Sequence, residues 1–155
     1  MKKILLIAIA TVAVFANANA TDGNEVSSVI SQSFYKEYAE AENVQWSLND
    51  DFVKASFVLN GESVDAYYDY NGAIVGSSKK IALDKLPSKA LRSFTKKYPF
   101  PSYNLKECIE FTNAGDDETN YFISLDDILS NTRVIIRIAP DGNISLFKKM
   151  SITKR

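Results

Sequence analysis

The sequence predicts an α+β protein in which two helices pack on one face of an antiparallel sheet. Three observations favour this class. Apolar residues recur at spacings of three and four in two separate segments, which is the period of a helix with one buried side. Elsewhere apolar and polar residues alternate, which is typical of strands with one buried face. Turn signals separate the alternating runs, at Asn60-Gly61, Asn71-Gly72 and Asp141-Gly142.

The first helix is predicted at about residues 25–40, and four strands follow it up to about residue 80. A second helix follows, with Pro87 in its first turn and Pro99 ending it. The apolar residues that share one side of each helix are Val26, Val29, Ile30, Phe34 and Tyr38, and then Leu86, Ala90, Leu91, Phe94 and Tyr98. The last four strands are predicted at 105–112, 120–125, 133–139 and 143–150.

This order, a helix and four strands occurring twice, indicates an internal repeat. The segments 33–38 and 93–98 read SFYKEY and SFTKKY, and the last turn of each half contains a glycine, Gly72 or Gly142. We expect two repeats, at about 25–80 and 84–152, that form a single domain over residues 21–155.

Residues 1–20 read as a signal peptide. Two lysines precede an apolar run at 4–16, and Asn17-Ala18-Asn19-Ala20 supplies a cleavage signal after Ala20. The run is shorter than the roughly 20 residues that a membrane span needs. Because no cysteine follows Ala20, we expect no lipid anchor. The mature chain is therefore expected to be periplasmic or secreted, without a membrane span.

Composition excludes several functions. Histidine is absent, which removes Ser-His-Asp and Cys-His catalysis and the commonest zinc sites. Cys108 is the single cysteine, so no internal disulfide can form, and alternation places it on the side opposite Leu105, Ile109 and Phe111. The net charge of −1 argues against nucleic-acid binding. No cofactor is expected, and the protein is predicted not to be an enzyme.

Acidic clusters occur in the turns at residues 50–51, 116–118 and 126–127, and Asp69 precedes Asn71-Gly72. Aspartate favours turns for local backbone reasons, and the loop at Asp69 lacks the further ligand positions of a calcium-binding loop. We therefore interpret these clusters as turns and expect no metal. A module that binds a cation or a small molecule remains the alternative function.

Several segments resemble the PepSY-like family of exported bacterial proteins, which is described as similar to the beta-lactamase-inhibitor protein. They are Ala41-x-Asn43-Val44-x-Trp46, residues 53–57, residues 66–72, Leu86-Pro87-x-x-Ala90 and Lys97-Tyr98-Pro99. The resemblance implies tandem units of a helix and an antiparallel sheet. Because the family has no agreed catalytic motif, it assigns no active residues.

The face of the sheet away from the helices is the candidate site. We expect Val53, Ala55, Phe57, Val64, Ala66 and Tyr68 to face inward, and Phe147 to lie opposite Ile144, Leu146 and Met150. Aromatic and arginine residues on an otherwise polar sheet are typical of a protein-binding surface, although cross-strand aromatic pairs also stabilise sheets. The sequence therefore predicts a protein partner in the cell envelope, contacted by Tyr67, Phe122, Arg133, Ile135, Arg137 and Phe147, and leaves the oligomeric state open.

Overall fold

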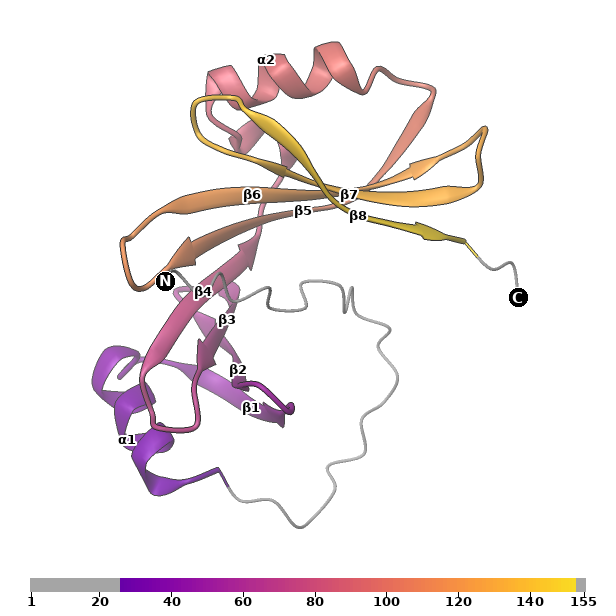
Figure 1. Cartoon of the computed structure of the whole chain (residues 1–155). Coiled ribbons are helices and arrows are strands. Elements are labelled where there is room, and N and C mark those ends of the chain that lie inside the picture. The colour runs from indigo at the N-terminus through magenta and orange to yellow at the C-terminus, as the bar shows by residue number, and fades with distance from the viewer. Residues whose placement is uncertain (1–25, 153–155) are drawn as a thin grey trace.

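The structure is a computed structural model that describes residues 26–152 (Figure 1). The predicted signal peptide, residues 1–20, lies outside the described residues. The α+β class with an antiparallel sheet and two helices is confirmed. In chain order the elements are α1 (Ser28–Glu37), β1 (Glu42–Leu48), β2 (Val53–Leu59), β3 (Glu62–Tyr68), β4 (Ile74–Lys80), the 3₁₀ helix η1 (Leu83–Lys85), α2 (Ser88–Lys97), β5 (Tyr103–Asn113), β6 (Thr119–Asp127), β7 (Thr132–Ile138) and β8 (Ile144–Ser151).

Both helices are shorter than the apolar spacing suggests. The hydroxyl of Ser27 accepts a hydrogen bond from the Ile30 N–H at 3.4 Å, so α1 begins at Ser28 rather than near residue 25. Ile30 and Phe34, one turn apart, are the buried residues of α1. In α2 the buried pair is Ala90 and Phe94. Within residues 26–152, no helix has both the length and the apolar composition that crossing a membrane requires.

The eight strands form one antiparallel sheet in which each strand pairs with the next along the chain. Both helices cover the same face of this sheet. Paired residues share a face, and the register links Val64 to Lys79, Lys79 to Glu110 and Glu110 to Tyr121. Val64 packs in the α1 core and Tyr121 in the α2 core, so the helix-covered face is continuous from one half to the other.

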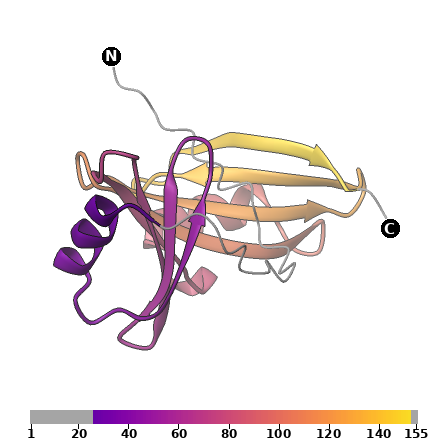
Figure 2. The same cartoon turned by 90° about the horizontal axis from the view of Figure 1, so that it is seen from below.

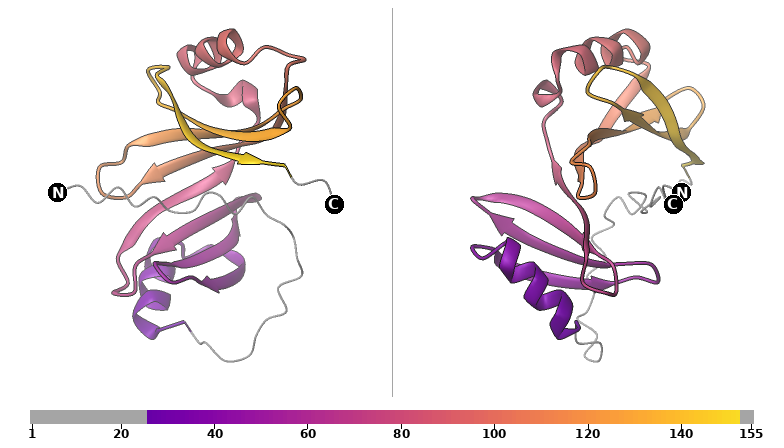
Figure 3. Two further views of the ribbon diagram at one scale, coloured as in Figure 1. Left: turned by 45° about the vertical axis from the view of Figure 1, so that its right-hand side comes forward. Right: turned by 60° about the vertical axis from the view of Figure 1, so that its left-hand side comes forward.

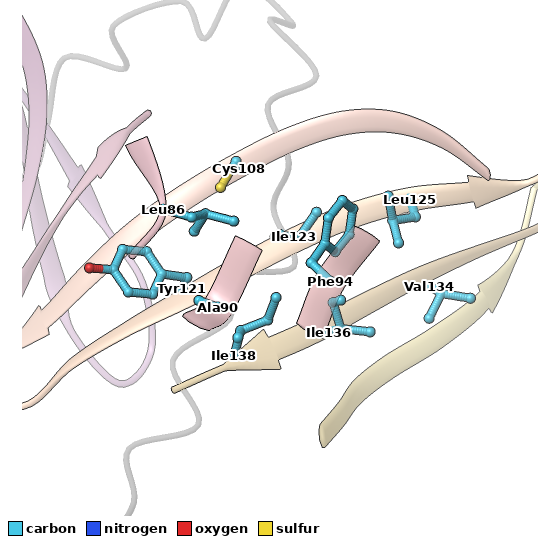
Figure 4. Packing of buried hydrophobic residues seen from close by; sticks show 10 residues of the cluster. All are labelled: Leu86, Ala90, Phe94, Cys108, Tyr121, Ile123, Leu125, Val134, Ile136 and Ile138. Atoms are coloured by element: carbon cyan, nitrogen blue, oxygen red, sulfur yellow. The ribbon is translucent and has the colours of Figure 1, made fainter. Parts of the chain in front are cut away.

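Twist sets the two halves of the sheet at a large angle. In Figure 2 the strands of the N-terminal half run nearly crosswise to those of the C-terminal half. As a result α1 and α2 lie at opposite ends of the molecule, with the sheet between them (Figures 1 and 3). Each helix has its own core: Phe34 packs with Phe57 and Tyr68, and Phe94 packs with Ile123 and Ile136 (Figure 4).

Cys108 lies in the α2 core, with 4% of its surface exposed (Figure 4). The expectation that it lies opposite Leu105 is wrong. A β-bulge between Leu105 and Glu107 breaks the alternation of β5, so that Leu105 pairs with Leu125 while Cys108 pairs with Ile123. Both pairs therefore face α2.

A second β-bulge changes the faces of β8. The pairing shifts between Ile135 and Ile136, whose partners are Lys148 and Leu146, and Phe147 lies between those two partners. Phe147 and Leu146 are on opposite faces, as predicted. Met150 pairs with Arg133 and therefore shares the face of Phe147, so its predicted place beside Leu146 is wrong.

The Asp69 segment is a turn. One carboxylate oxygen of Asp69 accepts hydrogen bonds from the backbone N–H groups of Asn71 and Ala73, both at 2.9 Å. The matching turn of the other half has Gly142, and Gly72 and Gly142 both have positive φ values, 87° and 91°. A helix and four strands thus occur twice in order. That the halves are copies of one unit stays a prediction.

Candidate binding surface

The face of the sheet opposite α1 and α2, the helix-free face, is continuous from β2 to β8. The cross-strand register shows which residues belong to this face, because each residue shares its face with its partner on the next strand. Its members include the bulge residue Phe147 and the paired residues Lys54, Ser56, Asp65, Tyr67, Gly76, Ser78, Lys80, Asn104, Glu107, Ile109, Phe111, Asn113, Asn120, Phe122, Ser124, Asp126, Arg133, Ile135, Arg137, Ser145, Lys148 and Met150.

Five rings form an aromatic row across this face: Phe52, Tyr67, Phe111, Phe122 and Phe147. Successive ring centroids lie 5.6, 6.0, 6.5 and 5.1 Å apart. These separations are within the range of favourable edge-to-face and tilted contacts. The row crosses the junction between β4 and β5, so aromatic contacts connect the N-terminal and C-terminal halves on the side of the sheet away from α1 and α2.

The six residues predicted for partner contact all lie on the helix-free face, but their exposure differs. Tyr67, Phe122 and Ile135 are buried, with 7%, 8% and 2% of their surfaces exposed. Phe147 is half-buried. The expectation of freely exposed side chains therefore fails for three of the six. Tyr67 and Phe122 are each in contact with two other rings of the aromatic row.

Tyr67 is held by a polar contact as well as by packing. Its hydroxyl lies 3.1 Å from the hydroxyl of Ser78, which is also buried. Burial raises the pKa of Tyr67 to about 12, although the hydrogen bond to Ser78 works in the opposite direction. Tyr67 therefore remains a neutral phenol at physiological pH and contributes packing rather than charge.

The two predicted arginines are paired across strands β6 and β7. Arg133 donates to both carboxylate oxygens of Asp126, at 2.7 and 3.1 Å. Arg137 donates to the side-chain oxygen of Asn120 at 2.8 Å and to Glu118 at 3.2 Å. The side chains remain 28% and 40% exposed, so both can still contact another molecule.

Asp126 forms ion pairs with two basic side chains on this part of the face. Besides Arg133, the ammonium group of Lys106 lies 3.4 Å from its carboxylate. The hydrogen bonds from Arg133 hold the pKa of Asp126 below its usual range. Asp126 is therefore ionised at neutral pH and fixes the plane of the Arg133 guanidinium.

Ser124 lies on the helix-free face between Phe122 and Asp126 and pairs across strands with Ile135. Its surface is 4% exposed, and within the described chain its hydroxyl has no hydrogen-bond partner. Buried hydroxyl groups are nearly always paired, so the Ser124 hydroxyl is an exception to that rule on this face.

Sequence reasoning missed Phe52 and Phe111 as members of the aromatic row. Phe52 lies in the turn before β2, outside any alternating run. Phe111 lies beyond the bulge of β5, where alternation counted from Leu105 assigns the wrong face. Counting from the Asn113 end of β5 would have placed Phe111 correctly, because the register is regular from Glu107 to Thr112.

The opposite face holds a cleft of about 260 Å³ over the central strands. Ser77 and Thr112 line it. At its wall the ammonium group of Lys79 lies 3.3 Å from the carboxylate of Glu62 and 3.8 Å from that of Glu110. Within residues 26–152, no three Cys, Asp or Glu side chains are grouped as ligands of a metal ion. Apolar side chains, Leu59 and Val64 among them, also line the cleft.

Comparison with known proteins gives the fold. No protein-family model matches the chain, and no curated protein matches it. Solved structures do match, including a BLIP-like protein from Bacteroides fragilis, which is 14% identical with a TM-score of 0.70, over 87% of this chain and 92% of that one. The chain has a BLIP-like fold. BLIP denotes the beta-lactamase-inhibitor protein.

Two further structures share the BLIP-like fold of this chain. A DUF2874 family protein from Bacteroides ovatus is 19% identical, with a TM-score of 0.71 over 84% of this chain and 90% of that one. A predicted periplasmic protein from Bacteroides eggerthii is 17% identical, with the same TM-score, over 84% and 91% of the two chains. At these identities the likeness establishes the fold and no activity. Membership of the PepSY-like family is not confirmed.

Proposed function

We propose that this chain is an exported, non-enzymatic binding protein that contacts a protein partner with its helix-free face and thereby inhibits or regulates an envelope or secreted enzyme. The observation that carries the proposal is the aromatic row, which spans the sheet face that neither α1 nor α2 covers within residues 26–152. A PepSY-like identity and periplasmic location belong to the same proposal. They are supported by the resemblance in sequence and by the similar structure from Bacteroides eggerthii.

The composition of the face supports a protein partner. Aromatic and arginine side chains are the residues most enriched at contacts that dominate binding energy. Phe147, Arg133 and Arg137 keep part of their surfaces accessible, and the buried rings beneath them hold the surface rigid. A rigid surface loses little conformational entropy on binding, which favours affinity.

The test is capture from envelope and culture-supernatant fractions of the producing cell, with the chain from residue 21 as bait. One variant carries Ser145→Glu and Lys148→Glu, two exposed positions on the helix-free side of β8. The matched control carries Lys149→Glu and Ser151→Glu, which are also exposed on β8 but pair with Val134 and Thr132 on the other face.

We expect both variants to melt at the temperature of the unchanged chain, because all four positions are exposed. A partner retained by the unchanged chain and by the control variant, but lost with the helix-free-face variant, supports the proposal. Retention or loss by both variants alike contradicts it. Purified partner enzyme activity, assayed with and without the chain, then tests inhibition.

The cleft on the helix-covered face supports a second candidate function, the binding of a small molecule. Its hydroxyl groups and its Glu62–Lys79–Glu110 charges suit a small polar ligand. A ligand at 100 times its dissociation constant stabilises a protein by about 2.7 kcal/mol, which a thermal-shift panel detects. A shift that Glu110→Gln removes supports this candidate, and the absence of any shift contradicts it.

A further inference from the structure

Large apolar side chains are exposed together at one end of the C-terminal half. Phe100 is 87% exposed, Leu129 is 91% exposed and Ile128 is 53% exposed. Phe100 belongs to the loop between α2 and β5, and the other two belong to the loop between β6 and β7. The two loops touch, because the Ile128 N–H donates to the carbonyl of Ser102 at 3.3 Å. We call Phe100, Ile128 and Leu129 the apolar tip.

The apolar tip protrudes from a well-anchored base. Asn131, at the end of its loop, has a φ of 50° and exchanges backbone and side-chain hydrogen bonds with Ile152, both at 3.0 Å. Below the other loop, the rings of Tyr98 and Tyr103 meet edge to face at 5.1 Å. These contacts hold the two loops in a defined conformation, and the apolar side chains of the tip are exposed in that conformation. Both loops lie at the same end of β5–β8 (Figures 1 and 3).

The backbone of the apolar tip has few donors left for a partner. The carboxylate of Asp127 accepts hydrogen bonds from the N–H groups of Leu129 and Ser130, at 3.0 and 3.1 Å. The N–H of Ile128 is used by Ser102. On the other loop Pro99 and Pro101 flank Phe100, and proline has no N–H. A tip built this way takes few unpaired backbone donors out of water.

Basic residues stand beside the apolar tip. Lys96 and Lys97 occupy the last turn of α2, directly before the Phe100 loop, and both are exposed. Lys149 lies near Asp127 and offsets its negative charge. Exposed Phe, Ile and Leu next to lysines are the composition of segments that enter the interface of an anionic bilayer.

We propose that the apolar tip inserts into the headgroup region of a phospholipid membrane that contains anionic lipids, while Lys96 and Lys97 contact the lipid phosphates. A bilayer suits the tip better than a protein pocket does, because the tip is highly exposed, is divided over two loops and offers apolar surface with few free backbone donors. The inference concerns a surface separate from the helix-free face and does not depend on the function proposed for that face.

The test is cosedimentation of the chain from residue 21 with vesicles made of equal parts phosphatidylethanolamine and phosphatidylglycerol. The tip variant carries Phe100→Ser and Leu129→Ser. The matched control is Leu146→Ser, which replaces another leucine that is 64% exposed, on β8. A second comparison uses two double variants. One carries Lys96→Gln and Lys97→Gln, and its control carries Lys85→Gln and Lys89→Gln, near the other end of α2.

We expect the unchanged chain and Leu146→Ser to bind the vesicles, and the tip variant to lose at least about tenfold in partition coefficient, because two large apolar side chains no longer leave water. The Lys96 and Lys97 variant should bind more weakly and the Lys85 and Lys89 control should not. Vesicles of phosphatidylcholine alone should retain less protein. Melting temperatures should agree among all these variants, since every changed residue is exposed.

Three results would each overturn the inference: no binding of the unchanged chain to anionic vesicles, equal losses for the tip variant and Leu146→Ser, or unchanged binding by the tip variant. Loss of partner capture by the tip variant in the absence of vesicle binding would assign the tip to a protein interface instead. The Ser145 and Lys148 variant should still bind vesicles, so failure of the proposed function and failure of this inference give different results.

Discussion

Phe122 on β6 and Phe147 on β8 meet edge to face across the intervening strand β7, with ring centroids 5.1 Å apart and planes inclined at 78°. Phe147 lies in the bulge of β8 and has no partner in the ladder of paired residues, and its ring is on the side of the sheet that carries Phe122. It closes the C-terminal end of the aromatic row. The same two rings thus contribute to the stability of the sheet and to the surface proposed for partner contact.

The energy of this contact can be measured with a double-mutant cycle. Phe122→Ala should destabilise the protein by about 3 to 5 kcal/mol because Phe122 is buried, and Phe147→Ala by about 1 to 2 kcal/mol because Phe147 is half-buried. Their coupling should be about 0.5 to 1.5 kcal/mol in urea denaturation. Leu146→Ala, next to Phe147 but on the other face, should show no coupling to Phe122. Equal coupling for both pairs would contradict the ring contact.

Cys108 should be almost unreactive in the folded protein. Burial, with smaller effects of Glu110 and Glu107, raises the pKa of its thiol to about 12, and only the thiolate attacks disulfide reagents. At pH 8 the thiolate fraction is then on the order of 10⁻⁴, and access is closed as well. We expect slow modification by an aromatic disulfide, fast modification in denaturant, and no disulfide-linked dimer under air. Rapid, complete reaction of the native protein would contradict the position of Cys108 in the α2 core.

Alternation of apolar residues predicted the class of the fold and the inward face of β2 and β3, where the register is regular from Val53 to Leu59. It misassigned Cys108 and Met150 because both lie beyond a β-bulge. A bulge adds one residue to one strand, and nothing in the alternating pattern marks which residue is extra. The predicted first helix was too long because periodicity continues through Val26 and Tyr38, which pack against the α1 core from outside the helix.

The sheet face of the candidate contact residues was predicted correctly, but their exposure was not. Tyr67, Phe122 and Ile135 were correctly placed on the face away from the helices, since a period of two separates the faces of a strand. Whether a residue on that face is covered depends on neighbours from other strands, such as Phe111. Strand pairing brings these neighbours together from distant parts of the sequence. Local sequence carries little information about such neighbours.

Asp126 should contribute to stability in a pH-dependent way. Its pKa in the folded protein is lowered by Arg133, so its contribution is present above the usual value of 3.8 and is lost as the pH falls through the lowered value. Arg133→Gln should cost about 1 to 2 kcal/mol at neutral pH and should flatten the loss of stability on the acid side. Urea denaturation between about pH 3 and pH 7 measures both effects. An unchanged acid slope would exclude the pairing with Arg133.

Tyr67 should have the opposite dependence, on the alkaline side. Its pKa is raised from 10.0 to about 12, so its contribution is fully present below 10.0 and is lost as the pH rises toward the folded value. Tyr67→Phe should remove one late-titrating phenol from the absorbance titration and reduce the alkaline loss of stability. At neutral pH it should cost about 1 kcal/mol, because the buried Ser78 hydroxyl loses its partner. A titration curve identical to that of the unchanged chain would contradict this assignment.

Gly72 and Gly142 should tolerate alanine much less than Gly61 does, although all three have positive φ values. A Cβ atom at Gly72 would lie 2.7 Å from a methyl carbon of Val29 on α1, and one at Gly142 would lie 3.0 Å from the Lys89 carbonyl of α2, whereas Gly61 has no atom within 4 Å. Gly61→Ala should therefore cost about 1 kcal/mol, from backbone strain alone. At the other two positions alanine must also push a helix away from its turn, so we expect at least about 2 kcal/mol in urea denaturation. Equal costs at Gly61, Gly72 and Gly142 would show that the helices do not rest on these turns.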